Sequence, residues 1–261
     1  MIPETFVEQW RTFANWQTLA MVEQDLIISR ALICLYNDPD INQSLVFRGG
    51  TALNKLFIQP PARYSEDIDF VQQKSAPIGP TLDKIKELLN PWLGTAKWKI
   101  TERSAKLVYK YQSIDSLAAK LKIEINTTEH FQVLPLQKTK FTIDSEWFKG
   151  STRIVIYALE ELIATKLRAL YQRRKGRDLF DLWYILKNNL VDIDHVIEIF
   201  KKYCSKDNIS ISKNLFQKNL DLKKANQDFK VDMNTLLPPE IYWDFDEAYN
   251  LVQDQIISKL D

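Results

Sequence analysis

The chain has 261 residues, of which 45% are hydrophobic, so one large domain or two small ones can bury a core. Its formal charge of +1 excludes a strong overall attraction to nucleic acid or to a membrane surface, and any basic surface must therefore be local. Two cysteines, Cys34 and Cys204, lie far apart among apolar neighbours and give no disulfide framework, while two histidines are too few for a histidine-rich zinc site.

Neither secretion nor membrane insertion is indicated by the sequence. No apolar run reaches the length of a membrane span, and the first four residues lack a basic region before a hydrophobic core. We expect a cytoplasmic protein with no membrane partner. Nothing in the spacing suggests a cysteine–histidine nucleophile.

The first predicted elements are helices over about residues 5–36. Apolar side chains recur there at steps of three and four residues, and the sequence Asn37-Asp38-Pro39 ends the pattern because the residue before proline avoids the helical region. We expect these helices to cover one side of a sheet.

A strand, a tight turn and a short helix follow over residues 45–57. The apolar residues 45–47 predict the strand, Gly49 and Gly50 the turn, and Thr51 the first turn of the helix. Glycine lets the backbone approach a ligand, and a helix N-terminus presents unpaired N–H groups, so this turn suits an anion such as a triphosphate. Lys55, one helical turn further on, either reaches a phosphate or faces water.

A second predicted strand carries two carboxylates. Side chains alternate across a strand, so Asp67 and Asp69 project from one face while Ile68 enters the core. Two such carboxylates suit Mg²⁺, which fills its remaining positions with phosphate oxygens and water. Arg63 and Ser65, just before this strand, are further candidates for contacting a carboxylate or a phosphate.

The tripeptide Asp-Ile-Asp recurs at residues 192–194, where the spacing of the following apolar residues is helical. There we interpret Asp192 as a helix cap. The tripeptide alone therefore does not indicate a metal site. The interpretation of Asp67 and Asp69 as metal ligands depends on the glycine turn that precedes them.

Strands are predicted beyond an amphipathic helix over residues 80–89, which Asn90-Pro91 should end. Residues 98–101, 106–111 and 118–126 alternate as antiparallel strands do. In the last of them Glu124 is a candidate third metal ligand, and the alternative is an ordinary solvent-facing polar strand. Residues 131–143 have further strand character, residues 145–152 form a turn-rich link, and we place a domain boundary near Ile156, giving domains 1–156 and 157–261.

The second domain is predicted to be all helical. Lys166 falls on the apolar stripe of a helix over residues 157–171, where a lysine needs either a partner, an anion-holding cleft or a route to solvent. A basic loop, residues 172–177, precedes a helix over 178–186 in which Asp178 is placed as an N-cap. Helices follow over residues 192–203 and 241–260, with a mixed polar segment over 209–229.

Four separated segments together resemble the AbiEii/AbiGii toxin family, which is related to the DNA polymerase beta nucleotidyltransferase superfamily. They are Arg48-Gly49-Gly50-Thr51-Ala52-Leu53, Arg63-Tyr64-Ser65-Glu66-Asp67-Ile68-Asp69-Phe70, Glu161-Leu162-Ile163-Ala164-Thr165-Lys166-Leu167 and Arg177-Asp178-Leu179-Phe180-Asp181-Leu182. Thr51 stands where the superfamily often has serine, and the gap to Asp67 is somewhat longer than usual.

The resemblance implies an α+β fold, with a nucleotidyltransferase-like mixed sheet flanked by helices and then a helical C-terminal domain. It implies functional importance for Lys166 and Asp178, a nucleoside triphosphate substrate, Mg²⁺ or Mn²⁺, an RNA acceptor such as tRNA, and a cognate antitoxin.

The sequence as a whole favours a metal-dependent nucleotidyltransferase. In this hypothesis Asp67, Asp69 and Glu124 hold Mg²⁺, and Lys166 neutralises the leaving pyrophosphate. Asp178 either activates the acceptor hydroxyl or orients Lys166. The alternatives are a metal-dependent phosphoesterase or nuclease that uses the same carboxylates, and a catalytically inactive nucleotide-binding module. A paired-carboxylate glycosidase leaves the glycine turn unexplained.

Overall fold

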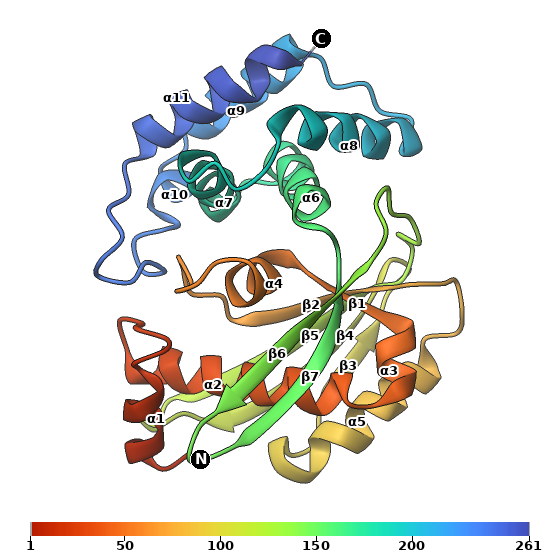
Figure 1. The fold of residues 1–261 in the computed structure, drawn as a ribbon, viewed down its shortest axis with the longest axis vertical. Coiled ribbons are helices and arrows are strands. Elements are labelled where there is room, and N and C mark those ends of the chain that lie inside the picture. Colours follow the sequence, from red (N-terminus) through yellow and green to blue (C-terminus); the bar gives the residue numbers. More distant parts are fainter. Residues whose placement is uncertain (1, 261) are drawn as a thin grey trace. The chain divides into compact units, whose positions relative to one another are not determined.

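Seven strands form one mixed sheet in the computed structural model, which describes residues 2–260 (Figure 1). The sheet order is β3-β4-β5-β2-β1-β7-β6. The strand bounds are β1 Leu45–Arg48, β2 Asp67–Gln72, β3 Lys97–Ile100, β4 Ser104–Gln112, β5 Ala118–Asn126, β6 Gln137–Asp144 and β7 Lys149–Ile156. Strand β2 pairs antiparallel with β1 and parallel with β5, and β1 pairs parallel with β7. The remaining pairs are antiparallel.

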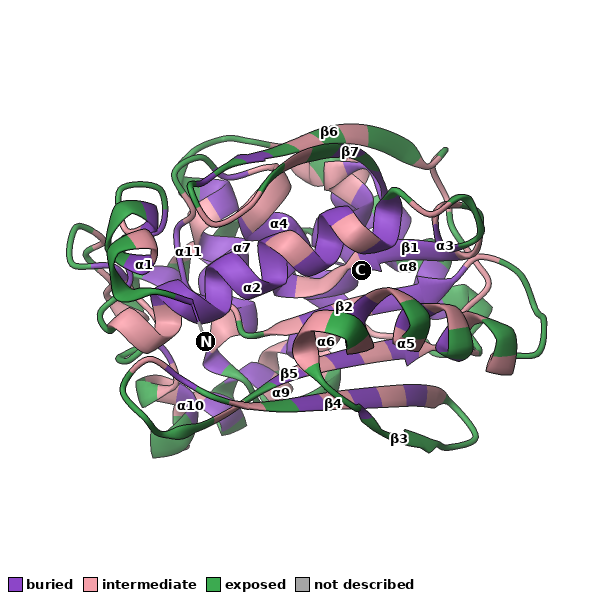
Figure 2. Cartoon of the chain, turned by 90° about the horizontal axis from the view of Figure 1, so that it is seen from below, coloured by how far each residue is buried: buried purple, intermediate pink, exposed green. Residues whose placement is uncertain are grey.

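The sheet belongs to the first of two compact units, Met1–Tyr157, which also contains five helices among its described residues. They are α1 Glu4–Trp10, α2 Leu19–Tyr36, α3 Pro39–Ser44, α4 Gly49–Leu56 and α5 Gly79–Leu93. Helix α2 is buried along most of its length, whereas the outer strands β3 and β6 are largely exposed (Figure 2). The predicted class, a mixed sheet flanked by helices with a helical C-terminal region, is confirmed.

The helices expected over about residues 5–36 are present as α1 and α2. Residues 11–18 separate them, and Thr18 caps α2 by accepting from the Met21 N–H. Two local expectations for this unit were wrong. Helix α5 continues through Pro91 and ends at Leu93, with Gly94 (φ +80) as its C-cap. Near the end of a helix, proline costs only one late hydrogen bond. Half of the expected link at residues 145–152 belongs to β7, which forms a hairpin with β6.

The second unit, Ala158–Asp261, is helical throughout its described elements. These elements are α6 Leu159–Gln172, α7 Gly176–Lys187, α8 Ile193–Lys206, α9 Lys213–Lys224, α10 Gln227–Val231, α11 Phe245–Gln255 and the 3-10 turn Ile257–Lys259. Asp192 caps α8, as expected for the second Asp-Ile-Asp copy, by accepting from the N–H groups of Asp194 and His195. Each helix within residues 2–260 is too short or too polar to span a lipid bilayer.

A buried lysine closes the C-terminal end of α6. The side chain of Lys223, on α9, is 5% exposed and donates to the carbonyl oxygens of Leu170 and Tyr171, the latter at 2.9 Å. Burial lowers the pKa of Lys223 to about 8, since desolvation disfavours the ammonium.

Candidate active site

The two carboxylates of β2 project from the same face of the sheet. Ile68 and Phe70, which alternate with them, are buried, whereas Asp67 and Asp69 are partly exposed. In the register Asp69 lies opposite Arg48 on β1 and opposite Glu124 on β5. Asp67 and Asp69 therefore lie on the same face of the sheet, as the alternation in the sequence predicted.

The glycine turn packs against the second of these carboxylates. Gly49 has φ +81, a left-handed conformation that favours glycine, and a Cβ at this position would lie 2.5 Å from Asp69 Oδ2. Because Gly49, Gly50 and Thr51 open α4, their N–H groups are the ones that an α-helix leaves without intrahelical partners. The turn and the acidic strand are thus brought together, as their coupling in the sequence indicated.

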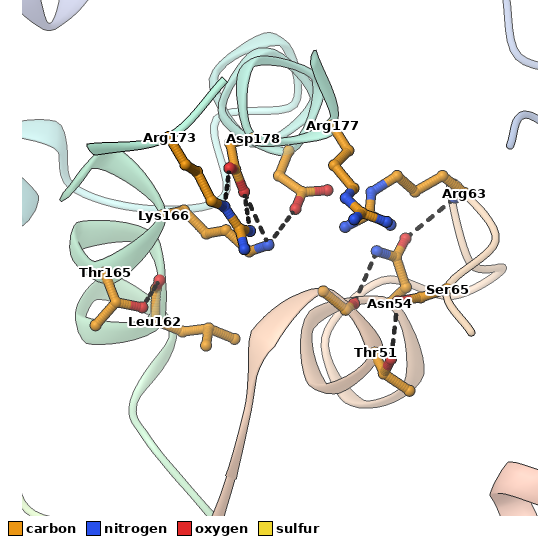
Figure 3. Close-up of polar contacts among 12 residues, drawn as sticks. Thr51, Asn54, Arg63, Ser65, Leu162, Thr165, Lys166, Arg173, Arg177 and Asp178 are labelled. Carbon is orange, nitrogen blue, oxygen red and sulfur yellow. Dashed lines mark hydrogen bonds and ion pairs between the residues drawn. The ribbon is translucent and has the colours of Figure 1, made fainter. Parts of the chain in front are cut away.

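Thr51 links α4 to the start of β2. Its hydroxyl contacts the carbonyl oxygen of Asp67 and lies 2.8 Å from the Ser65 hydroxyl, and its side chain is buried (Figure 3). These contacts hold the backbone of Asp67 in place at the start of β2. Thr51 and Ser65 therefore position the acidic strand, a role that the sequence did not distinguish from phosphate binding.

Arg63 and Asn54 hold the loop between α4 and β2. Asn54 donates to the Gly50 carbonyl and accepts from the N–H groups of Ala62 and Arg63 (Figure 3). The Arg63 side chain is 1% exposed, donates to the Tyr64 carbonyl, and packs so closely on Gly50 that a Cβ there would overlap Nη2. Asn54 was missed by the sequence analysis, because an asparagine inside a helical pattern carries no signal of the loop it holds.

Lys55 is engaged elsewhere in the same unit. Its ammonium lies 2.9 Å from Asp25 Oδ2 and 2.8 Å from the Ser29 hydroxyl, and Asp25 also accepts from Trp10 Nε1. Both charged side chains are less than 10% exposed. The structure therefore uses Lys55 to tie α4 to α2, and these contacts do not favour the predicted role in phosphate binding.

Two lysines surround the candidate third ligand, Glu124. Lys106 lies 3.0 Å and Lys122 3.7 Å from its carboxylate, and Lys122 also lies 2.5 Å from Asp67 Oδ2. Although partial burial lowers the pKa of Lys122, the carboxylates of Asp67, Asp69 and Glu124 raise it overall. Among the described residues no group of three or more histidine, cysteine or acidic side chains is arranged to hold a metal ion.

A donor set of two carboxylates fits Mg²⁺ or Mn²⁺ better than other metals. Magnesium commonly binds through one or two carboxylates and completes its shell with phosphate oxygens and water. Asp67 and Asp69 supply that number of oxygen ligands on one face, beside the N–H groups of α4. Glu124 is instead a counter-ion for lysines in this structure.

The second unit contains a buried ionic cluster around Lys166. Its ammonium lies 2.8 Å from Asp181 Oδ2 and 3.4 Å from Asp178 Oδ1, and all three side chains are at most 5% exposed. Arg173 binds Asp178 through two nitrogens, at 2.7 and 2.8 Å (Figure 3). Burial raises the pKa of Asp178, but the charges of Lys166 and Arg173 outweigh it and lower the pKa below its usual value.

Asp178 is not a helix cap, which was one of the roles that its position in the sequence allowed. Helix α7 begins at Gly176, and Asp178 lies inside its first turn with its side chain fully buried. Lys166 thus has a partner rather than a route to solvent, one of the alternatives that the sequence left open. Asp181 was missed as a member of this cluster, although it lies three residues after Asp178 on the same helical face.

Residues 30–251 match the family model described as nucleotidyl transferase AbiEii toxin, type IV toxin–antitoxin system. The chain belongs to this AbiEii family. It is accordingly a nucleotidyltransferase of a toxin family, as the resemblance of the four motifs implied. A search of curated proteins found no significant match.

Solved structures show that the fold is shared. MenT4, a nucleotidyltransferase toxin from Mycobacterium tuberculosis H37Rv, is 16% identical with a TM-score of 0.68, covering 100% of this chain and 91% of that one. JHP933 from Helicobacter pylori is 21% identical with a TM-score of 0.56, covering 90% and 89%. A putative nucleotidyltransferase from H. pylori is 22% identical with a TM-score of 0.51, covering 88% and 91%.

Proposed function

We propose that this AbiEii-family chain transfers a nucleoside monophosphate from a nucleoside triphosphate to a hydroxyl group of RNA, such as tRNA, with a divalent metal ion held by Asp67 and Asp69. The observation that supports this most directly is the contact between the glycine turn and the acidic strand, where Asp69 Oδ2 packs on Gly49. An anion-binding helix start beside two carboxylates is what a metal-bound triphosphate requires.

The transfer exchanges a phosphoanhydride bond of the triphosphate for a phosphodiester bond to the acceptor. The acceptor oxygen bonds to the α-phosphorus, the bond to the β-phosphate bridging oxygen breaks, pyrophosphate leaves, and the hydroxyl proton passes to water. When bound, the metal ion would polarise the α-phosphate and offset the charge of the leaving group. The N–H groups of Gly49, Gly50 and Thr51 would bind phosphate oxygens, and Thr51 and Ser65 would keep Asp67 in place.

Lys166 and Asp178 remain the predicted catalytic residues of the second unit. The Lys166 ammonium carries two carboxylate neighbours, Asp178 and Asp181, which hold it charged and fixed. In the proposal Asp178 acts as the positioning residue of Lys166 through direct contact.

The biological role that fits the family is that of a toxin controlled by a cognate antitoxin. Growth arrest on expression of the chain alone, relieved by its neighbouring gene product, is the expected result. A nuclease using the same carboxylates and an inactive binding module are the alternative functions.

Incubation of the purified chain with each α-labelled triphosphate, Mg²⁺ and total RNA tests the proposal. We expect label in RNA, its loss on removal of metal with EDTA, and at least a hundredfold reduction in D69N. The matched control is D194N, which changes the last residue of the second Asp-Ile-Asp copy, at a carboxylate that is 74% exposed.

Other outcomes would overturn the proposal. Shortened RNA without incorporated label would identify a nuclease. Triphosphate binding without labelling of RNA, together with unchanged toxicity of D69N, would identify a binding module.

A further inference from the structure

One face of the strands β3, β4 and β5 carries six lysines. Residues that pair across strands share a face, and the register places the six on the face that bears Asp67 and Asp69. They are Lys97, Lys99, Lys106, Lys110, Lys120 and Lys122. The opposite face of β4 and β5 is apolar and buried, as at Leu107, Tyr109 and Ile123. The register therefore confines the lysines to one side.

The lysine face is nearly without negative charge. Glu124 is the single acidic residue among the described positions of β3, β4 and β5 on this face, although the whole chain has 35 basic and 34 acidic residues. Glu124 pairs with both Lys106 and Lys122, so its one negative charge is shared by two ammonium groups. A local excess of positive charge therefore occurs in a chain that is almost neutral overall.

The four outer lysines have no ion-pair partner within the part of the chain that the structure describes. They are Lys97, Lys99, Lys110 and Lys120, and all four are exposed. By contrast, the inner Lys122 pairs with Asp67. Because neighbouring strands lie about 4.8 Å apart and alternate residues about 6.7 Å apart, the positive groups cover an area about 10 Å wide and 13 Å long that begins at the acidic strand.

We propose that this lysine face binds the phosphate backbone of the RNA acceptor and leads its reactive end to Asp67 and Asp69. The inference rests on the proposed function and adds the surface that the acceptor occupies. A polyanion matches unpaired lysines in charge, and contacts to phosphates position a nucleic acid without requiring a particular sequence. An acidic protein would meet the same charges, but such a partner would not need to begin beside the carboxylates where transfer occurs.

The test compares two fourfold variants of the full chain. K97Q/K99Q/K110Q/K120Q removes the outer lysines, and K138Q/K140Q/K202Q/K218Q removes the same number of exposed lysines elsewhere. Binding of fluorescein-labelled bulk tRNA is measured by anisotropy over a range of salt concentrations. We expect the first variant to lose at least about tenfold in affinity and its salt slope to fall by about three, since each phosphate contact contributes about 0.7–0.9. The control should lose less than threefold.

The outcomes separate this inference from the proposed function. Triphosphate binding, measured on the same preparations, should be unchanged in the first variant and so reports that it is folded. Equal loss of tRNA binding in both variants, or none in the first, would overturn the inference. Polyglutamate, measured in the same way, represents an acidic protein. A first variant that binds tRNA normally but loses polyglutamate binding would overturn the inference and assign the face to an acidic protein. Lysine-dependent tRNA binding without RNA labelling by the unmodified chain would refute the proposed transfer to RNA but would retain the lysine face as an RNA-binding surface.

Discussion

The ammonium of Lys166 lies 2.8 Å from Asp181 Oδ2, and neither side chain is more than 5% exposed. With Asp178, which Arg173 also binds, this pair forms an ionic cluster inside the helical unit. Charges that are buried in this way stabilise a fold only while their partners are present.

Replacement K166M should therefore destabilise the protein strongly. Two carboxylates would lose their shared cation, and removal of one partner from a buried ion pair costs about 3–5 kcal/mol. The exposed pair between Lys259 and Asp194 supplies the control, because K259M should cost about 0–1 kcal/mol. Urea unfolding followed by circular dichroism measures both, and similar midpoints would show that the cluster contributes little.

Replacement G49A should disable transfer. The added Cβ would meet Asp69 Oδ2 at 2.5 Å, and alanine is strained at φ +81. We expect a loss of about 1–3 kcal/mol in stability and at least about tenfold in rate, since a displaced carboxylate no longer fits its ligand. A Cβ added at Gly79 would meet no atom within 4 Å, so G79A should match the unmodified chain in both measurements.

The hydroxyl of Thr51, rather than its methyl group, should matter. T51V keeps the shape but leaves the carbonyl of Asp67 and the hydroxyl of Ser65 without this partner, which costs about 1–3 kcal/mol at a buried site. T51S retains the hydroxyl, so it should lose less than about 1.5 kcal/mol of stability and should keep most of its activity. Equal losses in the two variants, measured by thermal unfolding and RNA labelling, would contradict this role.

Lys122 should compete with a divalent metal ion for Asp67. Its ammonium lies 2.5 Å from Asp67 Oδ2, so K122M should raise the affinity for Mn²⁺ at least about fivefold, or about 1 kcal/mol. Calorimetry without nucleotide provides the measurement. K110M is the control, because Lys110 lies on the same face and has no ion-pair partner among the described residues. Its removal reports the effect of one fewer positive charge at longer range. Equal changes in the two variants would remove any special role for Lys122.

Stability should rise with pH because of Lys223. Its pKa is about 8 in the folded chain, below the value of about 10.5 for an exposed lysine, so between these values the unfolded state binds more protons. The cost of burying the ammonium is thus fully present below pH 8 and is relieved as pH rises towards 10.5, by on the order of 3 kcal/mol. Chemical unfolding across this range should show a steeper rise for the unmodified chain than for K223M, while the exposed variant K213M should keep the full slope.

The sequence alone predicted the part of the site that depends on local pattern. One continuous segment, residues 45–56, predicts the strand, the glycine turn and the start of the helix, and the structure contains all three. A second segment predicts the alternation around Asp67, which is also present. Alternation also placed Glu124 on its face, since β5 has the predicted bounds.

What the sequence did not reveal depends on which segments pack together. Asp178 had the spacing of a helix cap, and only folding shows that it lies opposite Lys166. Lys122 and Asp67 are far apart in the chain and meet because β5 pairs parallel with β2. The first half of β7 has the pattern of a link, because residues 149–152 form a polar, glycine-containing stretch before the buried residues 154–156.

The parallel pairing of β2 with β5, together with its antiparallel pairing with β1, has one more consequence. Asp69 lies on an interior strand and pairs with β1 and β5, while Asp67 next to it pairs with β5. The amide groups in the middle of this strand are therefore expected to exchange with solvent only when much of the sheet opens. Local unfolding of this strand is therefore an unfavourable route to inhibition. An inhibitory protein would instead have to block access to the two carboxylates while the fold stays intact.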